Sequence, residues 1–186
     1  NMIIAVSGVA RSGKDTFFSL LKSQSKNYQL KIKRLAFADQ IKKDLRPLVK
    51  RKFNIDILNP TAIEKELVRP LLVAYGTDLG RKMDKNFWIK VIEPQLQKNE
   101  SKGIISVITD TRYPNEQEFL KNKFKDSCCV HVSRHGFKPI NSEEEAYTPS
   151  LERNSDYVIN WSSFEGDHSK GLPFIQEFIN EKIKRK

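Results

Sequence analysis

The sequence lacks any long hydrophobic run: no apolar stretch approaches the roughly 20 residues that a helix needs to cross a bilayer. It shows no charged-then-apolar leader with a small-residue cleavage site, so we expect no export. It has only two cysteines, Cys128 and Cys129. Adjacent cysteines very rarely bridge each other, and two alone cannot make a structural zinc site. These absences favour a reduced, cytoplasmic compartment with no membrane partner.

The chain of 186 residues is 38% hydrophobic and 30% charged, which is typical of one soluble globular domain. Its net charge of +10 fits either a nucleic-acid-binding face or a pocket that holds several phosphates. The lysines are scattered along the chain, as on an ordinary solvated surface. We therefore do not expect a dedicated nucleic-acid site.

Short apolar runs alternate with segments of helical periodicity, which predicts an α/β fold with a mainly parallel, five-stranded sheet flanked by helices. We expect strands near residues 2–6, 32–37, 104–108, 128–132 and 157–160, and helices at 14–21, 39–53, 61–79, 84–96, from 114 onward and at 172–183. Pro70 is expected to break or kink its helix. The polar stretch 135–155 lacks periodicity and is expected to be a loop that acts as a lid.

The segment from Gly8 to Thr16 has the spacing G-x-x-x-x-G-K, between an apolar strand and a helix. Glycines let successive backbone N–H groups point at one centre, the helix adds its positive N-terminal end, and Lys14 adds a charge for the β and γ phosphates. A glycine turn with a surface lysine is the alternative. The context favours an ATP-binding loop made of Gly8, Val9, Ala10, Arg11, Ser12, Gly13, Lys14, Asp15 and Thr16.

Asp15 stands where such loops usually carry the Ser or Thr that binds Mg²⁺. A carboxylate is also a hard oxygen ligand, so Asp15 or the following Thr16 is predicted to contact Mg²⁺, directly or through water. Alternatively, Asp15 only stabilises the N-terminus of the helix.

A kinase needs a second anion site, and arginine is suited to it because its planar fork holds phosphate with two hydrogen bonds. Arg112 follows a buried strand in the run Asp110-Thr111-Arg112. Asp110 is placed to bind Mg²⁺ through water or to hold Arg112. Arg69 is a second candidate, although it also fits a solvated helix position, and Trp88 taken alone is more often a core residue.

Four motifs occur in order: Ser7 to Thr16, Leu35 to Lys42, Gly76 to Leu79 with Trp88, and Asp110 to Arg112 with Glu116. Together they resemble the deoxynucleoside monophosphate kinases of T-even and related bacteriophages. The similarity covers about residues 2–160 and includes the unusual Asp15.

This resemblance implies a single domain, 1–186, of the P-loop nucleoside monophosphate kinase type. It implies a helical acceptor-binding region at about 39–100 and a lid-like segment at about 134–156. Arg134 and Arg153 are implied as clamps on the ATP phosphates, and Asn160 is implied to lie near the adenine. Catalytic roles are implied for Lys14, Arg69, Asp110 and Arg112. The implied acceptor-binding residues are Ala38, Lys42, Arg69, Gly76, Thr77, Trp88, Asp110, Arg112 and Glu116.

The implied reaction moves the γ-phosphate of ATP, with Mg²⁺, to a deoxynucleoside 5′-monophosphate. Animal-type phosphomevalonate kinases also look similar, including a Gly-Lys-Asp loop, and dephospho-coenzyme A kinases are more distant. A non-catalytic nucleotide- or nucleic-acid-binding module is the alternative from another class. A homodimer is compatible with the sequence, which does not indicate the accepted bases.

Overall fold

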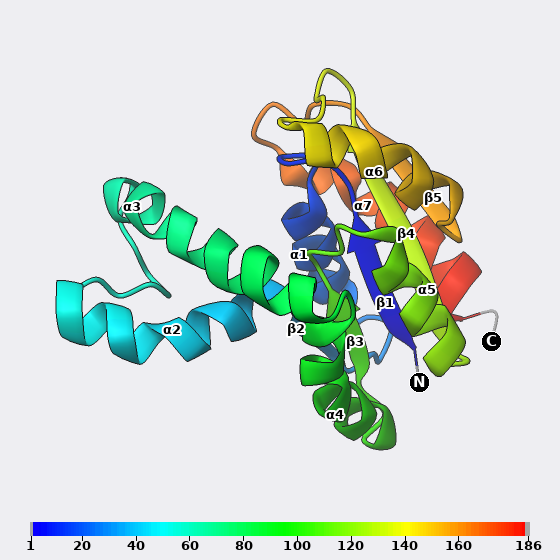
Figure 1. Ribbon diagram of the computed structural model, residues 1–186. Helices are drawn as coiled ribbons and strands as arrows, with labels where there is room; N and C mark the ends of the chain where they lie inside the picture. Colours follow the sequence, from blue (N-terminus) through cyan, green and yellow to red (C-terminus); the bar gives the residue numbers. More distant parts are fainter. Residues whose placement is uncertain (1, 185–186) are drawn as a thin grey trace. The chain divides into compact units, whose positions relative to one another are not determined.

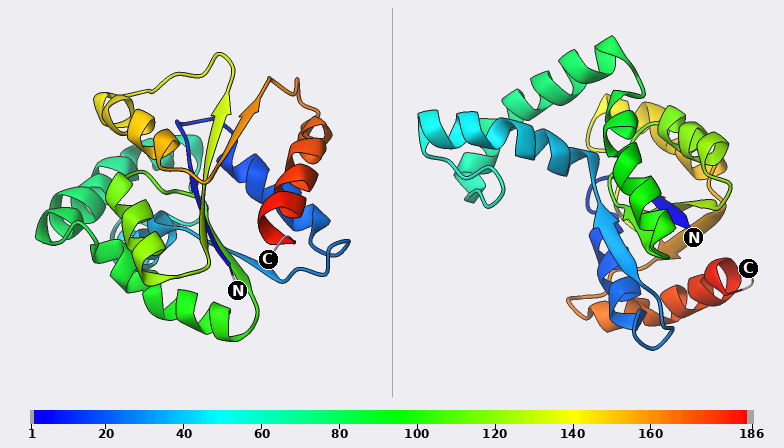
Figure 2. Two further views of the ribbon diagram at one scale, coloured as in Figure 1. Left: turned by 90° about the vertical axis from the view of Figure 1, so that its right-hand side faces the viewer. Right: turned by 90° about the horizontal axis from the view of Figure 1, so that it is seen from below.

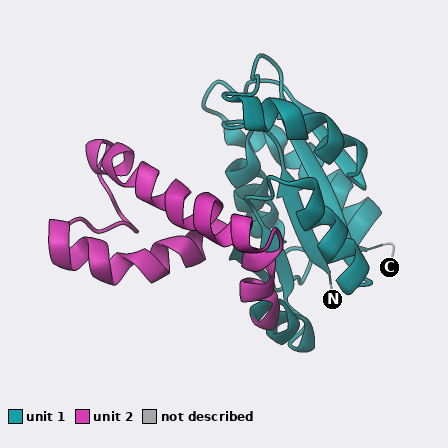
Figure 3. Ribbon diagram, viewed as in Figure 1, with its two compact units in different colours: residues 1–35, 95–186 teal, residues 36–94 magenta. Residues whose placement is uncertain are grey.

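The computed structural model describes residues 2–184 and divides into two compact units (Figure 3). Unit 1 comprises the described residues up to Leu35 and from Gln95 onward, and it contains the sheet. Unit 2, Ala36–Pro94, is helical. The predicted helical region at 39–100 thus nearly coincides with a compact unit of its own.

Unit 1 is built on a sheet of five strands in the order β2-β3-β1-β4-β5, and every recorded pairing is parallel (Figure 1). This confirms the predicted fold class. The strands are β1 Ile3–Ser7, β2 Ile32–Leu35, β3 Ile105–Ile108, β4 Ser127–Arg134 and β5 Tyr157–Trp161. The central strand β1 is buried at every position, as expected for a parallel strand covered on both faces.

Helices cover both faces of this sheet (Figure 2). On one face lie α1 Lys14–Gln24 and α7 Leu172–Phe178, which contact each other; α5 Pro114–Lys123 and α6 Ser142–Arg153 lie on the other. The segments that leave the neighbouring strands β1 and β3 therefore run to opposite faces. Such a switch point, at the carboxyl ends of the strands, is where open α/β sheets bind ligands.

The main core lies between β1, β3, β4, β5 and the helices α1 and α7. Phe17 of α1 and Phe178 of α7 meet edge to face, with ring centroids 5.3 Å apart. Short turns of other helix types, η2 His168–Gly171 and η3 Ile179–Ile183, flank α7. This packing fixes the start of α1, and with it the glycine loop.

Unit 2 consists of α2 Phe37–Phe53, α3 Ala62–Val73, the π-helix η1 Ala74–Arg81 and the first part of α4 Phe87–Ser101. Its small core is formed by Leu45, Val49, Ile57 and Val68. Thr61 and Glu64 form a reciprocal capping box at the start of α3, which satisfies two otherwise unpaired N–H groups.

One sequence-based expectation is wrong, and a second is wrong in part. The stretch 135–155 is not a structureless loop, because α6 occupies residues 142–153; Asn141 caps it by accepting a hydrogen bond from the Glu144 N–H at 2.8 Å. Pro70 does not break its helix, since α3 continues through it to Val73; the alternative, a kink, stays a prediction. Among the helices of the described residues, none combines the length and apolarity that crossing a bilayer requires.

Candidate active site

The glycine loop joins β1 to α1 and depends on two glycines with positive φ angles, Gly8 at 145° and Gly13 at 101°. A Cβ atom at Gly8 would lie 2.2 Å from the carbonyl oxygen of Val132, and one at Gly13 would lie 2.8 Å from the Trp161 ring. Both positions therefore exclude side chains sterically and conformationally. The loop is held close to the ends of β4 and β5.

Lys14, the first residue of α1, folds back over this loop. Its Nζ donates hydrogen bonds to the carbonyl oxygens of Gly8 at 2.7 Å and Val9 at 2.8 Å. Burial lowers the pKa of the Lys14 ammonium, and the positive charge of Arg112 lowers it further, while Glu144, Asp15 and Asp110 oppose the shift. The ammonium is thus a partly desolvated cation at the centre of the predicted phosphate site.

Asp110, Thr111 and Arg112 follow β3 and lie beside the end of β1, because the Thr111 N–H donates to the carbonyl oxygen of Val6 at 3.2 Å. Arg112 is exposed, yet its charge acts on Lys14. Unit 1 therefore brings together Lys14, Asp110 and Arg112, the three predicted catalytic residues that it contains.

Asp15 and Thr16 lie in the first turn of α1, with Asp15 exposed and Thr16 half-buried. Among residues 2–184, no group of three or more His, Cys, Asp or Glu side chains is arranged to hold a metal. The oxygen donors of Asp15 and Thr16 suit Mg²⁺, which usually binds through one or two protein ligands plus phosphate oxygens and water. The residues present fit that arrangement.

Glu116 lies in the first turn of α5 and is buried. Its Oε2 accepts hydrogen bonds from the backbone N–H groups of Arg112 at 2.8 Å and Tyr113 at 3.1 Å. Its carboxylate therefore holds the backbone that carries Arg112. The predicted part of Glu116 in binding the acceptor stays a prediction.

Arg134 ends β4 and lies near the glycine loop, since a Cβ atom at Gly13 would be 3.0 Å from Arg134 Nη2. Its guanidinium packs over the rings of Phe137 and Phe164, with centroid distances of 5.5 and 5.6 Å. The predicted ATP-clamp residue thus lies beside the loop, held by two aromatic rings.

Trp161 is a residue of the site that the sequence analysis did not identify. It is buried at the end of β5, and its indole N–H donates to the Ser12 carbonyl oxygen at 2.8 Å. This hydrogen bond holds the backbone of the glycine loop against the end of β5. Trp161 is paired with Arg134 in the β4–β5 register, a long-range relation that no local pattern reveals.

The remaining predicted acceptor residues belong to unit 2. Arg69 of α3 is largely exposed and approaches Glu66 at 4.0 Å. Trp88 is buried, and its indole N–H donates to the Gly76 carbonyl oxygen at 2.7 Å, so it supports the π-helix η1. Ala38, Lys42 and Thr77 are half-buried on α2 and η1.

His131 of β4 lies one strand away from the base of the glycine loop. It is buried, and its Nδ1 is 2.9 Å from Ser7 Oγ in the β1–β4 register. Burial lowers the pKa of His131, and the charge of Lys14 lowers it further, against an opposing effect of Glu152. The folded protein thus disfavours protonation of this imidazole.

This lowered pKa predicts acid destabilisation. As pH falls through about 6.5, His131 takes up a proton in the unfolded chain but stays neutral in the folded chain. The free energy of unfolding therefore falls with pH until the pKa of His131 in the folded chain is passed. We expect urea unfolding between pH 7 and 5 to show this loss in the wild type and a flatter dependence in His131→Gln. The exposed His135→Gln variant is the control, and equal slopes in all three proteins would contradict the assignment.

A glycine loop between a central parallel strand and a helix, with Lys14 folded over it, is the arrangement found in P-loop nucleotide-binding proteins. The deoxynucleotide monophosphate kinase family model matches residues 30–165, so the chain belongs to that family. This confirms the family predicted from the sequence.

Comparison with solved structures finds similar chains at low sequence identity. A sugar kinase from Janibacter sp. HTCC2649 matches with a TM-score of 0.50 and 10% identity, over 97% of this chain and 94% of that one. The APS kinase of Mycobacterium tuberculosis matches with a TM-score of 0.45 and 9% identity, over 97% and 98%.

A curated sequence is more similar over a shorter stretch. The uncharacterized protein ORF77 of Ictalurid herpesvirus 1 (strain Auburn) is 46% identical over 59 residues, which are 31% of this chain and 25% of that protein. The match therefore spans a quarter of the viral protein's length.

Proposed function

We propose that this protein transfers the γ-phosphate of ATP to a deoxynucleoside 5′-monophosphate. The observation that carries the proposal is the meeting of two cations, Lys14 and Arg112, at the carboxyl ends of β1 and β3. Lys14 belongs to a loop suited to the donor phosphates, and Arg112 provides a fork suited to a second phosphate. A protein that only binds a nucleotide has no need of the second arginine.

The proposed acceptor is a phosphate oxygen, which needs little activation. The second pKa of a phosphomonoester is about 6, so the nucleophile is largely ionised at neutral pH and no general base is required. The obstacle is the approach of two polyanions. Catalysis therefore rests on positioning and on the neutralisation of charge.

On the donor side, Lys14, Arg11 and the amides of the loop bind the β and γ phosphates, with Arg134 as an additional clamp. Asp15 and Thr16 would hold Mg²⁺, which when bound neutralises charge on the phosphate oxygens. The helix dipole of α1 contributes at the same point.

On the acceptor side, Arg112 binds the monophosphate, and Asp110 orients Arg112 or binds the metal through water. The other predicted acceptor residues belong to unit 2, and their part in binding the acceptor stays a prediction: Ala38, Lys42, Arg69, Gly76, Thr77 and Trp88. Movement of the 134–156 segment, a cytoplasmic location and a homodimer stay predictions.

The test is a coupled ADP-release assay across all deoxynucleoside and ribonucleoside monophosphates and phosphomevalonate. The proposal expects ADP release that depends on Mg²⁺ and on at least one deoxynucleoside monophosphate. Turnover with phosphomevalonate alone would contradict it, as would salt-dependent DNA binding without any ADP release.

A further inference from the structure

A carboxylate of the protein lies on the glycine loop itself. The backbone N–H of Ala10 donates to both oxygens of Glu144, at 3.2 and 3.3 Å. The N–H of Ile140 donates to the second of these oxygens at 3.2 Å. Glu144 is far from Ala10 in the sequence, and the helix α6 brings the two residues together. The carboxylate of Glu144 therefore occupies a backbone amide of a loop whose amides are suited to binding anions.

The local geometry explains how Glu144 reaches this position. Asn141 caps α6, which makes Glu144 the third residue of the helix. An acidic residue there commonly reaches back to the backbone N–H of the capping residue. Here Glu144 extends one residue further, to Ile140, and then crosses to Ala10. Its negative charge also acts on Lys14, against the effect of Arg112.

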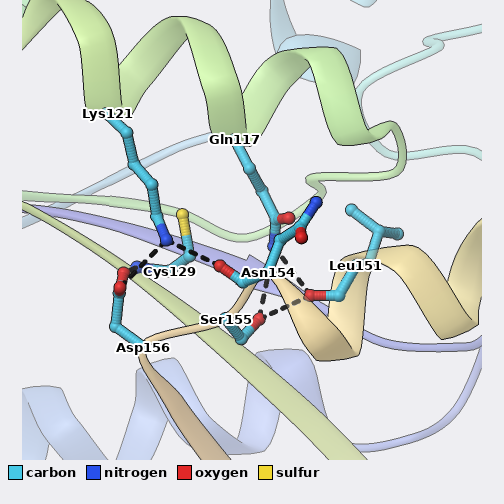
Figure 4. A network of polar contacts seen from close by, with 7 residues as sticks. All are labelled: Gln117, Lys121, Cys129, Leu151, Asn154, Ser155 and Asp156. Atoms are coloured by element: carbon cyan, nitrogen blue, oxygen red, sulfur yellow. Dashed lines mark hydrogen bonds and ion pairs between the residues drawn. The ribbon is translucent and has the colours of Figure 1, made fainter.

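The two ends of α6 are held differently. At its C-terminal end, Gln117 of α5 donates to the Leu151 carbonyl oxygen at 3.1 Å, and Lys121 donates to the Asn154 carbonyl oxygen at 2.6 Å (Figure 4). Asp156 continues this network to Lys121 and to the N–H of Cys129 (Figure 4).

The N-terminal turn of α6, in contrast, contacts the substrate loops through two glutamates. Glu144 binds Ala10 of the donor loop, and Glu143 accepts a hydrogen bond from the Tyr113 hydroxyl at 2.7 Å. Tyr113 directly follows Arg112. The helix is therefore fixed at one end and held by charged, replaceable contacts at the other.

We propose that Glu144 is an internal anion that competes with the phosphates of ATP for the glycine loop and leaves it when ATP binds. Two negative groups cannot share the Ala10 N–H and the field of Lys14 without repulsion. Displacement of Glu144 frees the first turn of α6, while the network around Gln117 and Lys121 retains the other end. This inference rests on the proposed function only in taking ATP as the loop's ligand.

The experiment is calorimetric titration of MgATP into the wild type, Glu144→Gln and Glu145→Gln. Glu144→Gln keeps the size of the side chain but removes its charge, and we expect the Kd for ATP to fall about tenfold. In steady state the KM for ATP should fall, with the acceptor KM unchanged. Glu145→Gln removes the same charge from an exposed neighbour in the same helical turn and should bind ATP like the wild type.

An unchanged or higher Kd in Glu144→Gln would overturn the proposal, because a merely structural glutamate gives that result. Amide hydrogen exchange at Ile140 supplies an independent readout. ATP should accelerate this exchange in the wild type, and Glu144→Gln should exchange fast without nucleotide; slower exchange with ATP would also overturn it. If the wild type binds ATP but phosphorylates no deoxynucleoside monophosphate, the proposed function fails while this inference is still decided by the titration.

Discussion

Lys14→Ala is expected to lower kcat by about 10²- to 10³-fold, the usual loss when a preorganised charge-stabilising donor is removed. The Lys14 ammonium already lies over the loop, where it donates to the carbonyl oxygens of Gly8 and Val9. It is partly desolvated, and burial lowers its pKa, so its charge acts on the donor phosphates with little screening by water. No other lysine lies within the sequence of the glycine loop.

The fold should survive this substitution, because the burial of the ammonium is itself unfavourable and alanine suits the first turn of a helix. Circular dichroism checks the fold. Lys26→Ala, which removes an equal charge from an exposed position, is the control and should keep wild-type turnover. A kcat of Lys14→Ala close to that of Lys26→Ala would contradict the role given to Lys14.

Arg112→Ala should have an effect of similar size, about 10²-fold or more in kcat/KM for the acceptor. Glu116 holds the backbone of Arg112 through hydrogen bonds from the N–H groups of residues 112 and 113, and the charge of Arg112 acts on Lys14. Removal of the guanidinium eliminates the two hydrogen bonds proposed for the acceptor phosphate and leaves the backbone amides of the glycine loop in place. We therefore expect the Kd for ATP to change less than the acceptor KM.

Arg112→Lys is the matched variant, since it keeps the charge and loses the planar fork. It should recover only part of the lost activity, because a point charge cannot form two parallel hydrogen bonds to phosphate. Steady-state kinetics with each substrate varied in turn measure both variants. Full recovery in Arg112→Lys would show that geometry at this position is unimportant, and an unchanged acceptor KM in Arg112→Ala would remove the residue from the acceptor site.

The sequence predicts those parts of the fold that depend on local patterns. The apolar run before Gly8, the helical spacing after Lys14 and the run before Asp110 each identify an element and the end of the sheet at which its loop lies. The meeting of Lys14 with Arg112 follows, because loops after neighbouring parallel strands leave the same edge of a sheet. That much of the site needs no long-range information.

The rest depends on contacts between distant segments. Trp161 supports Ser12 only because β5 lies beside β4, and Glu144 reaches Ala10 only because α6 packs near the loop. The helix α6 itself was missed since Pro149 and a polar composition obscure its periodicity. Of the break or kink predicted at Pro70, the break does not occur, because the helix tolerates proline at this exposed position.

The central claim is that donor and acceptor phosphates are held together, end to end, by the groups around Lys14 and Arg112. Calorimetric binding of an adenosine–deoxynucleoside pentaphosphate, which joins both substrates through one phosphate chain, tests it most directly. The Kd should lie far below that for ATP, and Lys14→Ala and Arg112→Ala should each raise it about tenfold or more. Binding no tighter than that of ATP, with Arg112→Ala indistinguishable from the wild type, would contradict the account.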